Sequence, residues 1–132
     1  MPPTKKPTAV KKAGGKKKRV IGARVKITLD DSRGNEKLIL ATPTGQTITL
    51  SSARGTVEIA DGHGNSIKLE PAGITIRADS RVTINATELK VNAANLVVDA
   101  GVSKFNGVLQ CDTLISNSVV SASYTPGAGN IL

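Results

Sequence analysis

From Ile67 to Val98 the chain reads IKLEPAGITIRADSRVTINATELKVNAANLVV. Triplets of an apolar, a polar and a second apolar residue recur there between short polar breaks, and successive triplets start 7, 8, 7 and 7 residues apart. Alternation with a period of two is typical of a β-strand with one buried face. Strands and turns this short fit a narrow prism better than a broad sheet. The residues predicted to pack along the axis of that prism are Ile67, Leu69, Ile74, Ile76, Val82, Ile84, Leu89, Val91, Leu96 and Val98.

The composition indicates that one chain cannot build this core alone. Apolar residues make up 39% of the 132 residues, but aromatic residues only 2%, with one Phe, one Tyr and no Trp. Large aromatic side chains normally supply much of the buried surface of a β-protein, and here Ile, Val and Leu must replace them. Because these Ile, Val and Leu side chains are small and evenly spread along the chain, we predict that several copies share one core.

Similar triplets lie further toward the N-terminus, with a longer period. They start at residues 27, 38, 48, 57 and 67, which are 11, 10, 9 and 10 residues apart. We predict antiparallel meander strands with longer loops over residues 27–66, as the base, and a β-helical shaft over 67–123. Beyond Ala100 the apolar residues follow no evident step, and residues 124–132 are predicted to form a loop at the tip. The predicted fold class is therefore all-β, an elongated and intertwined trimeric β-helix preceded by meander strands.

Residues 1–26 have a separate composition. They hold 10 of the 18 Lys and Arg residues and no acidic residue, which leaves 8 basic and 10 acidic residues in the rest of the chain. We predict a basic tail that is disordered when free. It could bind nucleic acid, stay solvated or dock on an acidic hub, and nucleic acid is disfavoured because the tail has no aromatic residue on which bases could stack. The residues predicted to dock on a hub or an anion are Lys5, Lys6, Lys11, Lys12, Lys16, Lys17, Lys18 and Arg19.

Two runs carry a family resemblance. The run ITLDDSRGNE at residues 27–36 and the run VEIADGHGN at 57–65 resemble the spike region of the phage baseplate assembly protein V family and of the valine-glycine-repeat spike proteins of type VI secretion. The resemblance implies a homotrimer wound about one axis, which acts as the membrane-piercing central spike of a contractile phage tail or related injection system. It also implies a hub protein at the N-terminal end, a place for a PAAR-type tip protein at the C-terminal end and transient contact with an outer membrane.

The residues that could carry chemistry are isolated. His63 is the only histidine and lies between two glycines, Cys111 is the only cysteine, and adjacent Asp30 and Asp31 fit a turn at a strand end. We therefore expect no enzyme activity, no metal and no cofactor. The alternative function is a single-chain β-solenoid binding module whose basic tail contacts nucleic acid or an anionic surface.

The sequence also predicts where the protein is made. There is no apolar segment of a secretory signal and no run of about 18 apolar residues that could span a membrane. We expect synthesis in the cytoplasm of a bacterial host and a final location in the baseplate of the virion tail.

Overall fold

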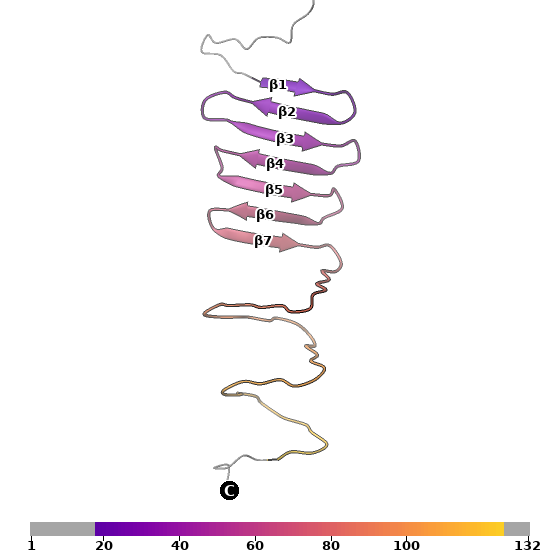
Figure 1. The fold of residues 1–132 in the computed structure, drawn as a ribbon, viewed down its shortest axis with the longest axis vertical. Helices are drawn as coiled ribbons and strands as arrows, with labels where there is room; N and C mark the ends of the chain where they lie inside the picture. Colours follow the sequence, from indigo (N-terminus) through magenta and orange to yellow (C-terminus); the bar gives the residue numbers. More distant parts are fainter. Residues whose placement is uncertain (1–17, 126–132) are drawn as a thin grey trace, which may run out of the picture. The chain divides into compact units, whose positions relative to one another are not determined.

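The computed structural model describes residues 18–125, which contain seven β-strands in one sheet and no helix (Figure 1). The predicted docking residues from Lys5 to Lys17 and residues 126–132 of the predicted tip loop lie outside the described range. The strands are β1 (Lys18–Ile21), β2 (Lys26–Asp30), β3 (Lys37–Ala41), β4 (Thr47–Ser51), β5 (Thr56–Ala60), β6 (Ser66–Glu70) and β7 (Gly73–Arg77).

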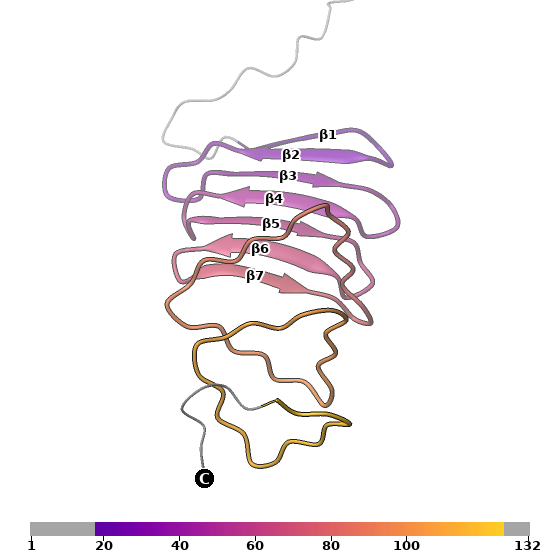
Figure 2. The same cartoon turned by 60° about the horizontal axis from the view of Figure 1, so that its bottom comes forward.

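Each strand pairs antiparallel with the next one in the chain, and the strands follow one another in this order in both views (Figures 1 and 2). The predicted antiparallel meander is therefore confirmed, and the predicted triplets from 27–29 to 74–76 lie in β2–β7. The sheet extends further than predicted at both ends. It begins at Lys18, inside the predicted basic tail, and antiparallel pairing continues past residue 66 to Arg77.

The register of the sheet aligns the apolar residues in two columns across the strands, which we call the apolar columns. Because side chains alternate between the two faces of a strand, residues paired directly across from one another share a face. The first column contains Ile21, Ile27, Leu40, Ile48, Ile59, Ile67 and Ile76, and the second contains Leu29, Leu38, Leu50, Val57, Leu69 and Ile74. The opposite face carries mostly polar residues, with Glu58 directly across from Lys68.

The loops at one end of the strands lie against one another. Gly62 has a φ of 81°, and a Cβ there would lie 3.1 Å from the carbonyl oxygen of Thr44, so both the backbone and the space favour glycine. In the same loop the carboxylate of Asp61 accepts hydrogen bonds from the backbone N–H groups of His63 and Asn65, at 2.7 and 3.1 Å. The side-chain oxygen of Asn65 accepts a bond of 2.8 Å from the backbone N–H of Asp79. These bonds fix the path of the chain as it leaves β7.

The chain divides into two units, of which the second begins at Glu88. The described part of this second unit, residues 88–125, contains no strand and consists of short runs joined by bends (Figure 2). The bends fall at residues 94, 101, 107, 112, 117 and 122, so that successive bends are 7, 6, 5, 5 and 5 residues apart. The prediction that the apolar residues beyond Ala100 follow no step is therefore wrong. The distance between successive bends shortens from seven residues to five, so the steps there are too short to follow the interval of seven or eight residues seen from Ile67 to Val98.

Candidate subunit interface

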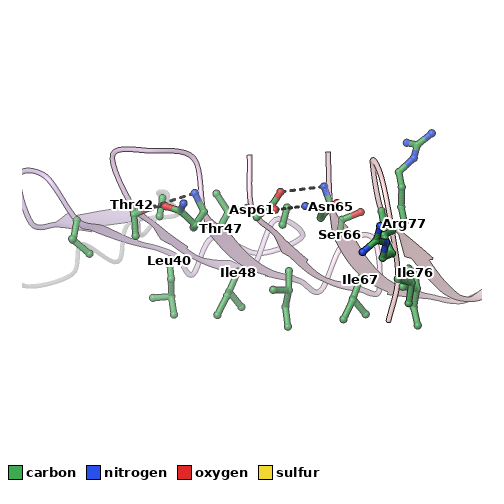
Figure 3. A pocket seen from close by; sticks show the side chains of 18 residues that line it. Leu40, Thr42, Thr47, Ile48, Asp61, Asn65, Ser66, Ile67, Ile76 and Arg77 are labelled. Atoms are coloured by element: carbon green, nitrogen blue, oxygen red, sulfur yellow. Dashed lines mark hydrogen bonds between the residues drawn. The ribbon is translucent and has the colours of Figure 1, made fainter. Parts of the chain in front are cut away.

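The face of the sheet that carries the apolar columns is uncovered. No apolar side chain in residues 18–125 is buried, and the column residues of β2, β4 and β6 are 38–44% exposed. Leu40, Ile48, Ile67 and Ile76 project from the same side of the sheet and line an open groove of about 610 Å³ (Figure 3). An exposed, contiguous apolar surface of this kind marks an interaction site.

The structure brings four of the predicted axial residues together and places the others in the regular steps of the chain. Ile67 pairs with Ile76 and Leu69 with Ile74 across β6 and β7. Val82 follows β7 and lines the same groove as Ile76. None of the predicted axial residues from Val82 to Val98 lies in a strand, so the structure does not test their place on an axis.

Side chains in the second unit fall into two rows that differ in exposure. With Thr87, where the chain also bends, counted as the first bend, large apolar residues at the second and fourth positions after each bend are 58–70% exposed, and we call them the inner row. Apolar residues at the first and third positions are 83–97% exposed, and we call them the outer row. The inner row comprises Leu89, Val91, Leu96, Val98, Phe105, Leu109, Leu114, Val119 and Tyr124, and the outer row comprises Val97, Val102, Val108, Ile115 and Val120.

The backbone of the second unit lacks the partners that the sheet provides. Residues 88–123 form no strand and no backbone–backbone hydrogen bond with another described residue of their unit. Two bends are closed locally by serine: the Ser116 hydroxyl donates to the carbonyl of Ser118 and accepts from its N–H, and Ser121 and Ser123 repeat this arrangement five residues later. Extended backbone normally pairs its N–H and C=O groups in a ladder, and no such ladder forms among the described residues of this unit.

Sequence reasoning missed most of the apolar surface. The column residues of β2 to β5 lie in the predicted base of the spike and Ile21 of β1 lies in the predicted basic tail, although they show the same alternation as the triplets from Ile67 onward. In the second unit, Phe105, Leu109, Leu114 and Val119 were not included because their step had not been recognised. The signal that finds them is the second position after each bend residue, or the fourth in the case of Phe105.

Arg19 occupies an unexpected place for a residue predicted to dock on a hub. It lies directly across from Leu29, which puts it on the apolar face at the β1 end of the second column. Its side chain is half-buried, whereas Val20, on the opposite face, is exposed. Of the predicted docking residues, Lys18 and Arg19 are therefore part of the sheet.

The polar residues singled out in the sequence act in turns. The hydroxyl and the backbone N–H of Ser32 both donate to the carboxylate of Asp30, which lowers the pKa of Asp30 below its ordinary value. The pKa of Asp61 is lowered in the same way, first by the side-chain amide of Asn65 and then by the N–H of His63. Among the described residues no three His, Cys, Asp or Glu side chains come together as a metal site.

A comparison with protein families identifies this arrangement. The model of the phage baseplate V C-terminal trimerisation domain matches residues 21–76 and, in a second register, residues 37–97. Together the two matches span residues 21–97, more than half of the chain. The chain belongs to the phage baseplate V family.

The family match agrees with the geometry of the sheet. Its first register runs from Ile21 to Ile76, the two ends of the first apolar column. The second match starts 16 residues after the first and ends 21 residues after it. This shift is about the length of one hairpin, since β2 and β4 begin 21 residues apart. The second match also extends past β7 to residue 97, where the chain forms no strand. The comparison with curated proteins finds no match.

Membership of this family accounts for the uncovered apolar face of the sheet. A baseplate V trimerisation domain is a structural component of the phage tail baseplate and assembles as a homotrimer. In the described residues there is no helix with the length and apolar character needed to cross a membrane.

Proposed function

We propose that three copies of this baseplate V domain form the central spike of a contractile tail or related injection system. The supporting observation is that residues 88–123 form regular steps with an apolar inner row, yet have no backbone partner in their own unit. Three copies wound about one axis would supply the missing ladder and bury the inner row. A single-chain solenoid, the alternative, would pair its own successive turns.

In the proposed trimer the apolar columns of three sheets face one another around the axis. The polar faces, with Glu58 and Lys68 at their centre, remain in water. Covering the columns removes apolar side chains from water at about 25 cal/mol per Å², and it removes the exposed apolar face that would otherwise promote aggregation.

The change in step length gives the proposed spike a taper. With about 3.3 Å per residue, a seven-residue side spans roughly 23 Å and a five-residue side roughly 16 Å. The steps shorten from seven to five residues between Thr87 and Gly107, so the narrow end is C-terminal. A stiff rod with a narrow end can carry axial force from a contracting sheath into an outer membrane. Because intertwined chains must separate together, unfolding is slow.

The two ends of the spike have different partners in this proposal. The lysine-rich residues 1–17, with Lys18 and Arg19 at the start of the sheet, dock on an acidic surface of the baseplate hub, and this contact weakens as salt screens the charges. At the other end a PAAR-type tip protein would cover the last steps of the spike. The chain is made in the cytoplasm of the bacterial host before it enters the virion.

Oligomeric state and shape test the proposal. Sedimentation equilibrium of the full chain is expected to give three times the mass of one 13.6-kDa chain. Small-angle scattering is expected to give an elongated particle rather than a globular one. A monomer that remains folded at micromolar concentration contradicts the proposed spike and favours the single-chain solenoid.

A further inference from the structure

The polar face of the sheet carries a pocket of its own, separate from the apolar groove. The pocket has a volume of about 280 Å³ and extends over β3, β4, β5 and β6, beside Arg54 in the turn between β4 and β5. Near the strand ends it is lined by Lys37, Ser51 and Thr56, which lie across from one another in the register. A second row lies two residues further in and comprises Ile39, Thr49, Glu58 and Lys68.

The cations at the strand-end side of this pocket form no ion pair. The one ion pair in residues 18–125 joins Lys68 to Glu70, at 3.4 Å. Lys37 is half-buried and lies directly across from Asp30, whose carboxylate accepts hydrogen bonds within its own turn. Arg54 is exposed in the neighbouring turn, so this side has two cations against one carboxylate. An ammonium and a guanidinium in such a position can hold the oxygens of a phosphate group.

The inner row offers hydrogen-bonding and apolar groups instead. Thr49 and Glu58 are half-buried, and the Glu58 carboxylate forms no ion pair within residues 18–125. An ionised carboxylate only accepts hydrogen bonds, whereas a hydroxyl both donates and accepts them. Ile39 lies directly across from Thr49 and adds an apolar surface. Two residues of a strand span about 7 Å, so the pocket changes from cationic to hydroxyl-binding over roughly the length of one phosphorylated sugar.

We propose that this pocket binds a sugar phosphate, with the phosphate between Lys37 and Arg54 and the sugar hydroxyls on Thr49 and Glu58. Ligand pockets usually measure about 300–1,000 Å³, so a pocket of about 280 Å³ suits one sugar unit. Residues 18–77 contain no Phe, Tyr or Trp on which a nucleotide base could stack. Free phosphate would use only the cationic side and would leave the Glu58 carboxylate without a donor.

The pocket is complete within one chain, so this inference does not depend on the trimer. In the proposed spike the apolar columns face the axis and the polar faces point to water. The pocket therefore stays open to a ligand in the assembled spike and is repeated on each of its three sides.

The test titrates the isotope-labelled full chain with glucose-1-phosphate, inorganic phosphate or glucose, and follows the backbone amide signals of Ser51, Arg54 and Thr56 by NMR. We expect glucose-1-phosphate to bind about tenfold more tightly than inorganic phosphate, and glucose to bind more weakly than both. Lys37→Gln is expected to weaken the binding of glucose-1-phosphate about tenfold, because it removes a charge-assisted hydrogen bond. Lys26→Gln makes the same change on the polar face at the other end of the strands and should bind as wild type.

A further variant, Glu58→Gln, separates the sugar from the anion. An amide is a weaker acceptor than a carboxylate and does not repel a free anion, so the preference for glucose-1-phosphate over inorganic phosphate should fall about fivefold. The spectra also show whether each variant keeps its fold. The inference is wrong if glucose-1-phosphate does not shift these amide signals at millimolar concentration, or if Lys37→Gln and Lys26→Gln weaken binding equally. Equal affinity for inorganic phosphate and glucose-1-phosphate would also overturn it, since the pocket would then recognise only the anion.

Discussion

The sheet of residues 18–77 and the stepped segment of residues 88–125 differ in how far one chain pairs its own backbone groups and covers its own apolar side chains. The sheet pairs its backbone within one chain and leaves only the apolar columns uncovered. Residues 88–123 of the stepped segment form no backbone–backbone hydrogen bond with another described residue of their unit, and the apolar residues there are exposed. Antiparallel hairpins between neighbouring strands form quickly because their contacts are local. We therefore expect the local hairpins of the sheet to form before the stepped segments of different chains meet.

The largest expected effect is on the sheet. Ile76→Asp places one carboxylate from each chain on the apolar face, at a cost of at least about 3 kcal/mol for each buried charge. We expect the trimer to dissociate at micromolar concentration, measured by sedimentation. Thr75→Asp is the matched control, since Thr75 pairs with Lys68 on the polar face, and it should remain trimeric. A folded Ile76→Asp trimer would show that the columns do not form the interface.

The second prediction separates the two regions. Leu114→Asp changes the inner row and should leave a trimer held by the sheet, while amide hydrogens of residues 88–123 lose protection from exchange by roughly a hundredfold or more. Ile115→Asp, one residue further along in the outer row, should keep that protection in aqueous buffer. Equal loss in the two variants would contradict the assignment of inner and outer rows. Hydrogen exchange with mass spectrometry makes this measurement.

A smaller effect is expected at Arg19. Three half-buried guanidinium groups would approach one another at the β1 end of the columns, and replacing such charges by apolar groups is often stabilising. Arg19→Leu is expected to stabilise the trimer by about 1 kcal/mol per chain and to raise its thermal midpoint by a few degrees. Lys26→Leu, on the polar face, should not. A lower midpoint for Arg19→Leu would indicate that Arg19 has a stabilising partner in the trimer.

The smallest effect concerns pH and the loop at Asp61. Hydrogen bonds lower the pKa of Asp61 in the folded chain below the value of 3.8 that applies to the free group. Its contribution to stability is therefore complete above about pH 4 and is lost as the pH falls through the lower, folded pKa. Asp61→Asn should flatten the acid side of the stability profile, followed by thermal unfolding at several pH values. An unchanged profile would mean that other carboxylates dominate the acid response.

The sequence predicted the strands well because their signal is local. The alternation of Ile27, Leu29 and their equivalents is set by the pleat of each strand, and the turns between them hold Gly and Asn, so the meander and the trimer could both be inferred. The five-residue steps are not found because each is too short to hold a full triplet: Leu109, Leu114 and Val119 have no second large apolar residue two positions later. The place of Arg19 on the apolar face depends on the register of β1 with β2, which composition does not reveal.

The alternation of inner and outer side chains begins anew at each bend, so the length of the stepped segment can change by whole steps. Asn117 and the four residues after it form a self-contained module, with its own corner and its own inward and outward side chains. Removing or duplicating such a module would change how far the rod reaches while leaving the facing of every other residue intact, whereas a change of one residue would disturb a whole side. In the proposed spike, the reach of the rod would therefore change in increments of one module, without redesign of the parts on either side.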